Sequence, residues 1–205
     1  MLHTRVFILR GLSGSGKSTF AEKFLRPLFH HFEIVSADRF FTNEKGEYAF
    51  DLDMLSAAHE QCYRNFEFHL KFMSEHAFNE SYYHDQPRRS ALIVDNTNLE
   101  PYEIAPYWMK ASVLGMSPEI LTFNGLGDID DHARRNLHGL THQQLERQQR
   151  RFQAAEIPFH WRSSHFTVHH TSAAFRWKIT RETEKGEQLE VKNLLYPYRD
   201  DVPAL

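Results

Sequence analysis

Residues 11–18, GLSGSGKS, limit the possible folds of this chain more than any other part of its sequence. They match the pattern G-x-x-x-x-G-K-[ST] of a phosphate-binding loop, and the apolar run RVFILR at residues 5–10 precedes them directly. The segment FAEKFLR that follows is typical of a helix, which we expect to end at Pro27. A strand, a glycine-rich loop and a helix in this order predict the first unit of an α/β fold.

The groups of this loop have distinct expected tasks in binding a nucleoside triphosphate. Consecutive backbone N–H groups and the N-terminus of the following helix provide a cradle for phosphate oxygens. We expect Lys17, as an exposed loop side chain, to bridge the β- and γ-phosphates, and the Ser18 hydroxyl to bind Mg²⁺. The predicted ligands are therefore ATP and Mg²⁺, and the predicted ATP-binding residues are Gly11, Ser13, Gly14, Ser15, Gly16, Lys17, Ser18 and Thr19.

Strand-like and helix-like patterns alternate along the chain from this loop to residue 152. Three further apolar runs predict strands, at residues 33–36, 91–95 and 119–123. A long helix with Asp51 as its N-cap is predicted to bury one stripe of side chains, namely Leu55, Ala58, Cys62, Phe66, Leu70 and Met73. Further helices are predicted at residues 98–115, 128–137 and 141–152. The alternation predicts a parallel sheet with right-handed crossovers.

The pattern changes after Pro158. Residues 165–170 predict one more strand, and residues 172–193 alternate in hydropathy around the turn EKGE. This second segment predicts a β-hairpin, either appended to the sheet or folded over the core. The chain is therefore expected to contain a loop-bearing domain at residues 1–160, which includes a lid at about residues 125–152. A β-rich appendage at residues 161–205 is expected to pack on the same domain.

Two aspartates, Asp38 and Asp95, each follow a predicted strand, at the sheet edge where open α/β folds bind their ligands. Transfer of a phosphoryl group to a hydroxyl requires a carboxylate that takes the proton, and we assign this general-base role to Asp38. Asp95 ends the run LIVD, which resembles a Walker B strand, so we expect it to help hold Mg²⁺, directly or through water. The alternatives are that Asp38 caps a turn and that Asp95 is a structural acceptor for the loop 96–98.

Arg134 and Arg135 lie on a predicted helix shortly before Gly139, a residue that can act as a hinge. A guanidinium on a mobile lid stabilises the charge of phosphoryl transfer, so both arginines are candidate catalytic residues alongside Lys17 and Asp38. A solvated helix face is the alternative explanation for either arginine. The arginines of the next helix are assigned to the surface, and they are Arg147, Arg150 and Arg151.

Composition sets outer limits on function. A net charge of −3 excludes a generally basic nucleic-acid-binding chain, and the 14 histidines show no metal-binding spacing. The single cysteine, Cys62, cannot form an intrachain disulfide and is expected to be a buried, reduced thiol. No apolar run approaches the roughly 20 residues of a membrane-spanning helix, so we expect a cytoplasmic protein without a membrane partner.

Six sequence blocks carry a resemblance to a known family. They occur in the order RGLSGSGKST, SADRFF, GEYAFD, AHEQC, LIVDNTN and ARRNLHGL. Over residues 5–152 the chain resembles the polynucleotide-kinase-like P-loop kinases, which include the kinase domain of Nedd-binding proteins, phage polynucleotide kinase and relatives described as AAA-type ATP-binding proteins. The resemblance implies a P-loop kinase-type parallel sheet of four or five strands flanked by helices, Asp38 as general base and an arginine-bearing helical lid.

These observations together predict an ATP-dependent phosphotransferase with a hydroxyl acceptor. A polynucleotide 5′-OH, on RNA or DNA, is the leading candidate for that acceptor. Arg39 is the expected substrate-binding residue, although phage polynucleotide kinases place their arginine slightly farther from the base. Two alternatives remain: a kinase of a small metabolite or nucleotide sugar, and an ATP-binding module that hydrolyses ATP slowly without transfer.

Overall fold

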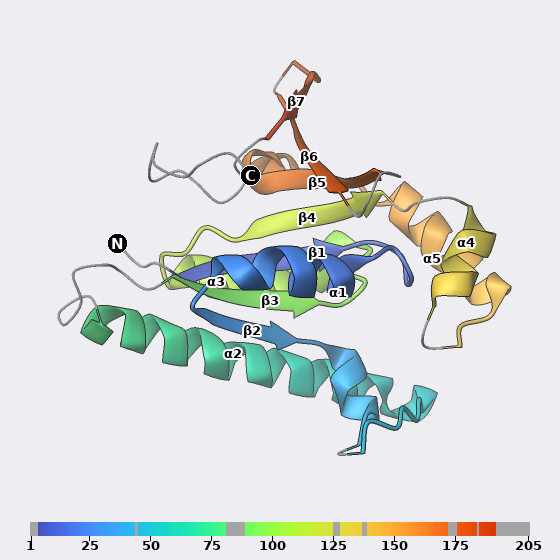
Figure 1. Ribbon diagram of the computed structural model, residues 1–205, viewed down its shortest axis with the longest axis horizontal. Coiled ribbons are helices and arrows are strands. Elements are labelled where there is room, and N and C mark those ends of the chain that lie inside the picture. Colours follow the sequence, from blue (N-terminus) through green and yellow to red (C-terminus); the bar gives the residue numbers. More distant parts are fainter. Residues whose placement is uncertain are drawn as a thin grey trace.

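The computed structural model describes residues 4–43, 45–80, 89–124, 128–136, 139–171, 176–183 and 185–191. In this part of the chain, seven strands form one sheet in the order β2-β3-β1-β4-β5-β6-β7 (Figure 1). Five of them pair in parallel, and they are β1 (Thr4–Arg10), β2 (His31–Val35), β3 (Ser90–Asp95), β4 (Glu119–Asn124) and β5 (His165–Thr171). The other two, β6 (Arg176–Glu182) and β7 (Gln188–Glu190), extend the sheet from β5 as antiparallel strands.

The predicted α/β fold with a parallel sheet and a C-terminal strand pair is confirmed. Of the two arrangements left open for the hairpin, the structure shows that it continues the sheet. Parts of the predicted lid and appendage lie outside the described residues, at residues 125–127, 137–138, 172–175, 184 and 192–205.

The helices follow the predicted order with shifted ends. The first begins as α1 (Lys17–Phe20) and continues through a π-helical turn (Ala21–Leu25) and a 3-10 turn (Arg26–Leu28). The expected end at Pro27 is therefore wrong: Pro27 is accommodated at the start of the 3-10 turn, where its missing N–H is not needed. The remaining α-helices of the described chain are α2 (Leu55–Glu80), α3 (Pro101–Val113), α4 (Ile129–Arg135) and α5 (His142–Ala154). No described helix is long and apolar enough to cross a membrane.

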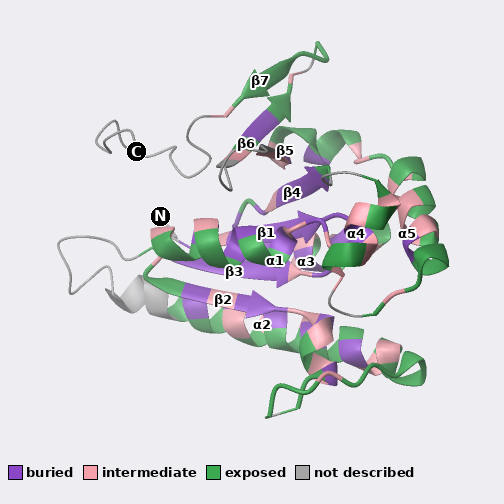
Figure 2. Cartoon of the chain, turned by 45° about the vertical axis from the view of Figure 1, so that its right-hand side comes forward, coloured by how far each residue is buried: buried purple, intermediate pink, exposed green. Residues whose placement is uncertain are grey.

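Strand β1 lies between two hydrophobic layers, because successive side chains of a strand point to opposite faces of the sheet. Val6 and Ile8 pack in the layer that contains α2 and α3, whereas Phe7 and Leu9 pack in the layer that contains α1. All four side chains are inaccessible to solvent. Figure 2 shows the central strands buried and the outer surfaces of the helices exposed. Coverage of both faces explains why β1 and β3 contain continuous apolar runs, at residues 6–9 and 91–94.

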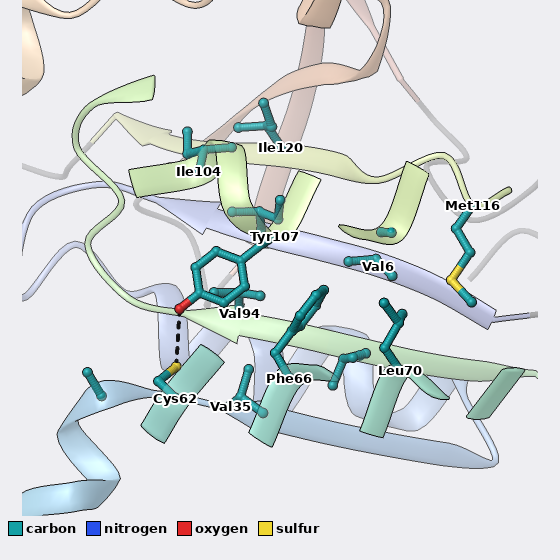
Figure 3. Packing of buried hydrophobic residues seen from close by; sticks show 14 of the residues in the cluster. Val6, Val35, Cys62, Phe66, Leu70, Val94, Ile104, Tyr107, Met116 and Ile120 are labelled. Atoms are coloured by element: carbon teal, nitrogen blue, oxygen red, sulfur yellow. Dashed lines mark hydrogen bonds between the residues drawn. The ribbon is translucent and has the colours of Figure 1, made fainter. Parts of the chain in front are cut away.

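The predicted apolar stripe of α2 faces the sheet. Leu55 is half-buried, and the other members of the stripe are buried: Ala58, Cys62, Phe66, Leu70 and Met73. Figure 3 shows Phe66 and Leu70 directed from the helix toward the strands. Asp51 is an N-cap as predicted, but it caps a 3-10 turn (Leu52–Met54) that leads into α2.

The contrast between Phe66 and Phe68 on α2 gives a test of this packing. Phe66 is fully buried and Phe68 is 66% exposed, although both are large aromatic residues of the same helix. Phe66→Ala should lower the free energy of unfolding by about 3–5 kcal/mol, because it removes buried area and leaves a cavity. Phe68→Ala should change it by no more than about 0.5 kcal/mol. Urea unfolding measures both, and equal losses would contradict the orientation of α2.

Candidate active site

The phosphate loop connects β1 to α1 at the carboxyl edge of the sheet. Its turn is closed by the N–H of Ser15, which donates to the carbonyl of Leu12 at 3.1 Å. The N–H of Gly11 donates to the carbonyl of Thr97 at 2.8 Å, which joins the start of the loop to the chain after β3. Gly16 has a φ of +91° and acts as the N-cap of α1, a conformation that favours glycine. The predicted strand, loop and helix are therefore present.

Lys17 is buried, with 7% of its surface exposed, and the expectation of an exposed side chain is wrong. The loop folds over the first turn of α1, and the Lys17 Nζ donates to the carbonyls of Gly11 at 3.0 Å and Leu12 at 2.8 Å. Burial lowers the pKa of Lys17, and the negative charges of Asp95 and Asp38 oppose that shift. The ammonium group is thus held inside the loop between carbonyls and two carboxylates.

Asp95 ends β3, the strand that pairs with β1, and this pairing brings its carboxylate to the first turn of α1. Burial raises the pKa of Asp95, while the charge of Lys17 and a hydrogen bond with Ser18 oppose the increase. A carboxylate and a hydroxyl side by side are hard oxygen donors of the kind that Mg²⁺ prefers. Asp95 and Ser18 therefore fit a magnesium site. Thr19, the next residue of the helix, is exposed.

Asp38 lies in a 3-10 turn (Ala37–Phe41) directly after β2. Ser36 is the N-cap of this turn, since its Oγ accepts the N–H of Asp38 at 3.2 Å. The cap of the turn is thus Ser36, and the Asp38 carboxylate contributes instead to the electrostatic surroundings of Lys17 and Asp95. Arg39, the next residue, is exposed beside it.

Asn96 joins the ends of β2 and β3. Its Oδ1 accepts the N–H of Ala37 at 2.9 Å, and its Nδ2 donates to the Cys62 Sγ at 3.5 Å and the Tyr107 hydroxyl at 3.4 Å. The Tyr107 hydroxyl also donates to the Cys62 Sγ at 3.4 Å (Figure 3). Burial raises the pKa of the Cys62 thiol, which agrees with the predicted buried, reduced cysteine. This network fixes the turn that carries Asp38 relative to the turn that follows Asp95.

Helices α4 and α5 contact the phosphate loop directly. The ring Nδ1 of His132 lies 3.2 Å from the carbonyl oxygen of Ser13, and the N–H of Ser13 donates to the Gln148 Oε1 at 3.1 Å. A Cβ on Gly14 would lie 2.6 Å from the carbonyl oxygen of His132, so only glycine allows α4 to approach so closely. Sequence reasoning missed His132 and Gln148, because nothing in the local pattern marks a residue more than 100 positions from its partner.

The two candidate lid arginines differ in their surroundings. Both are exposed, and Arg134 forms an ion pair with Asp131 at 2.7 Å. Arg135 lies one helical turn after His132, on the same side of α4. Burial lowers the pKa of His132, and the positive charges of Arg135 and Lys17 lower it further. The charge of Arg135 thus acts on His132, which contacts the loop, whereas Arg134 pairs with Asp131.

Arg10 is a further buried cation beside the loop, which sequence reasoning also missed. Its guanidinium donates to the carbonyls of Leu99 at 2.9 Å, Phe152 at 3.0 Å and Ala155 at 3.2 Å, and it lies over the Phe152 ring at 4.1 Å. Burial lowers the pKa of Arg10 to about 10, so it remains charged at neutral pH. Arg10 thus ties the C-terminus of α5 to the end of β1. Arg151 pairs with Glu100 and Glu103 at the surface, as assigned from the sequence.

The C-terminal hairpin also reaches the phosphate loop. The indole of Trp177 on β6 lies 3.1 Å from the position of a Cβ on Gly16. Its ring packs edge-on against Phe20 of α1, at a centroid distance of 5.2 Å, and against Phe123 of β4 at 6.0 Å. The appendage is therefore part of the surroundings of the loop, a role that the sequence left open.

The fold and this loop define a P-loop kinase-like ATP-binding domain. A family model described as an AAA domain matches residues 6–155, and the chain belongs to that family. The match covers the phosphate loop, both aspartates and the α4–α5 lid.

Three relatives place this domain among known proteins. Human NEDD4-binding protein 2 is 29% identical over 151 residues, which are 71% of this chain, and the chain spans 7% of the length of that protein. A chain of the Pnkp1/Rnl/Hen1 RNA repair complex has a TM-score of 0.52 and 17% identity, over 74% of this chain and 44% of that chain. Kti12 from Chaetomium thermophilum, in complex with ADP-AlF3, has a TM-score of 0.51 and 15% identity, over 80% of this chain and 88% of that one. These comparisons confirm the resemblance to P-loop kinases, and the structural matches show a shared fold.

The buried position of Lys17 makes Lys17→Met a sharp test of the nucleotide site. Methionine keeps the covered aliphatic stem, so the fold should persist while the phosphate contact is lost. Because a hydrogen bond to a charged group contributes about 1.5–3 kcal/mol, MgATP should bind about 10- to 100-fold more weakly in calorimetry. Lys23→Met, at an exposed position of the same helical segment, is the control and should bind MgATP like the wild type. Equal affinities for the two variants would contradict the site.

Proposed function

We propose that this chain is an ATP-dependent phosphotransferase that moves the γ-phosphate of ATP to a hydroxyl group. One observation carries the proposal: the buried Lys17 ammonium lies within the electrostatic reach of both Asp95 and Asp38. Phosphate-binding loops need a cation at this position, and transfer to a hydroxyl needs a carboxylate next to it. Lys17 begins α1 after the loop that follows β1, and the two aspartates come from the ends of β3 and β2; these three strands are neighbours in the sheet order.

In the proposed reaction, the acceptor oxygen forms a bond to the γ-phosphorus while the bond from that phosphorus to the bridging oxygen of ADP breaks. Asp38 takes the proton of the acceptor hydroxyl, so the products are ADP and a phosphate monoester. Lys17 and the backbone N–H groups of the loop stabilise negative charge on the phosphate oxygens. Each group acts from a position that the loop and the strand ends fix in advance.

Ser18 and Asp95 are the residues that would hold Mg²⁺. The ion, when bound, neutralises charge on the phosphate oxygens. The hydrogen bond between these two residues already brings their oxygens together, so the carboxylate needs little rearrangement. Ser18 is exposed at the start of α1, on the side from which a nucleotide has access.

The acceptor that we favour is the 5′-OH of a polynucleotide. Arg39 supports this class, because it presents an exposed cation next to Asp38, where a substrate phosphate can bind. The similarity to a chain of an RNA repair complex points in the same direction. Two alternatives must be separated from a polynucleotide acceptor by experiment. One is a small metabolite or nucleotide sugar as acceptor, and the other is slow ATP hydrolysis without transfer.

Asp38→Asn tests the proposed reaction. Asparagine keeps the size of the side chain but cannot take a proton near neutral pH, so transfer should fall by about 10²- to 10⁴-fold. The acceptors are 5′-OH RNA, 5′-OH DNA, nucleosides, nucleotide sugars and sugars, each incubated with γ-labelled ATP and Mg²⁺. ATP affinity measured by calorimetry should stay within a few-fold of the wild type.

Full transfer by Asp38→Asn would move the base to another residue, with Asp95 the first candidate. Loss of ATP binding would place Asp38 in the magnesium site. An ATPase rate that no acceptor changes would favour the module without transfer. Each outcome thus identifies which part of the proposal fails.

Arg135→Ala and Arg134→Ala test the lid. We expect Arg135→Ala to lower kcat by at least about tenfold, because a lid arginine stabilises transition-state charge and arginine fingers contribute about 10³–10⁵ in rate. Arg134→Ala should remain within about threefold of the wild type, because its guanidinium is exposed and paired with Asp131. Steady-state kinetics with MgATP measures both. The reverse order of effects would show that α4 turns its other face to the nucleotide.

A further inference from the structure

The Asp38 carboxylate has a close polar neighbour, the hydroxyl of Tyr48. Burial raises the pKa of Tyr48 to about 12, and the charge of Asp38 and a hydrogen bond between the two side chains add to the increase. At neutral pH the phenol is therefore protonated, and its O–H donates a hydrogen bond to the carboxylate. Asp38 thus has a fixed donor on one side, while Lys17 and Asp95 lie on the side of the phosphate loop.

A small hairpin of the backbone carries Tyr48 to Asp38. Tyr48 lies opposite Thr42 in an antiparallel bridge. Backbone hydrogen bonds flank the pair on both sides, from the N–H of Ala49 to the carbonyl of Phe41 at 2.8 Å and from the N–H of Asn43 to the carbonyl of Glu47 at 3.0 Å. Two hydrogen bonds around one residue leave its Cα little freedom to move relative to the turn that carries Asp38.

The tip of this hairpin is closed by side-chain hydrogen bonds. The Asn43 Oδ1 accepts the N–H groups of Lys45 at 2.9 Å and Glu47 at 3.0 Å. Gly46 has a φ of +81°, a conformation that the tight turn requires and that glycine adopts without strain. The hairpin is therefore locally determined, although it lies in a connection between β2 and α2.

Aromatic packing gives the Tyr48 ring a fixed orientation. The ring meets Phe41 edge-on, at a centroid distance of 6.2 Å and an interplanar angle of 72°. Phe41 is 6% exposed and belongs to the same 3-10 turn as Asp38. The ring and the carboxylate are thus held by one rigid turn. A phenylalanine at position 48 would fill the same space, so the hydroxyl adds a hydrogen bond to Asp38 and little to packing.

We propose that Tyr48 is a positioning residue for Asp38: its hydroxyl holds one carboxylate oxygen, which leaves the other oriented to take the proton of the acceptor hydroxyl. This proposal rests on the proposed role of Asp38 as general base. Misplacement of a reacting group by about 1 Å can lower the rate about 100-fold. A hairpin that holds the carboxylate in a fixed orientation would therefore raise the rate of transfer.

The test compares four variants: Tyr48→Phe, Asp38→Asn, the double variant, and Tyr63→Phe as a matched control. Tyr63 is a half-buried tyrosine whose hydroxyl is also hydrogen-bonded to a carboxylate, that of Glu67 on α2. ADP release from MgATP is measured with and without a 5′-OH RNA oligonucleotide, so that hydrolysis by water supplies a rate even where transfer does not occur. Calorimetry gives the Kd for MgATP, and thermal unfolding reports on the fold.

Tyr48→Phe should lower kcat by about 10- to 100-fold with the Kd for MgATP within about threefold of the wild type. Tyr63→Phe should match the wild type in kcat. In the Asp38→Asn background, adding Tyr48→Phe should cost no further activity, because the hydroxyl acts only through the carboxylate.

Two results would overturn the positioning role and leave the base assignment intact. One is a wild-type kcat in Tyr48→Phe. The other is that Tyr48→Phe lowers kcat equally in the wild-type and Asp38→Asn backgrounds. Wild-type turnover in Asp38→Asn, or no ADP release by the wild-type protein, would instead overturn the proposed function on which this role rests. The single variant at Asp38 thus separates the two failures.

Discussion

The positive charge of Lys17, buried at the carboxyl edge of the sheet, is the constraint on which the rest of the site depends. Burial of an ammonium group is costly unless acceptors and opposite charges surround it. The loop supplies the carbonyls of Gly11 and Leu12, and the ends of β3 and β2 supply the charges of Asp95 and Asp38. In turn, Lys17 opposes the tendency of burial to neutralise Asp95. The loop and the two acidic strand ends therefore form one electrostatic unit.

Helices α4 and α5 are anchored to this unit by hydrogen bonds to backbone groups. Arg10 binds carbonyls at the C-terminus of α5, where the last carbonyls of a helix lack partners within the helix. Gln148 and His132 contact the two backbone polar groups of Ser13. Since these contacts use backbone atoms of the loop, any displacement of α4 or α5 changes the shape of the phosphate cradle. The position of the two helices and the shape of the loop are thus coupled through Ser13.

The sequence was sufficient for the features that depend on local pattern or on a general rule of the fold. The loop motif, the strand at residues 91–95 and the apolar stripe of α2 are local, and the convergence of Asp38 and Asp95 follows from the rule that strand ends meet at one edge. The burial of Lys17 and the contacts of Arg10, His132 and Trp177 could not be predicted. The contacts of Arg10, His132 and Trp177 join segments distant along the chain, and their partners are decided by the order of strands in the sheet and by how closely helices approach a glycine. The carbonyls that Lys17 contacts are close to it in the sequence, but the charges of Asp95 and Asp38 come from other strand ends.

The nucleotide side and the acceptor side of the site are held by interactions of different range. The loop, the lid and the hairpin with Trp177 come from opposite ends of the chain and constrain one another across the sheet. Asp38 is instead held by Ser36 and Tyr48, and its turn is joined to β3 by Asn96 and packs against α2 through Ala37 and Phe41. Exposed positions of this segment, such as Arg39, can therefore change with few consequences for the phosphate loop. Variation at such exposed positions can adapt the site to a new acceptor, while Ser36 and Tyr48 hold the turn and the carboxylate of Asp38 in place.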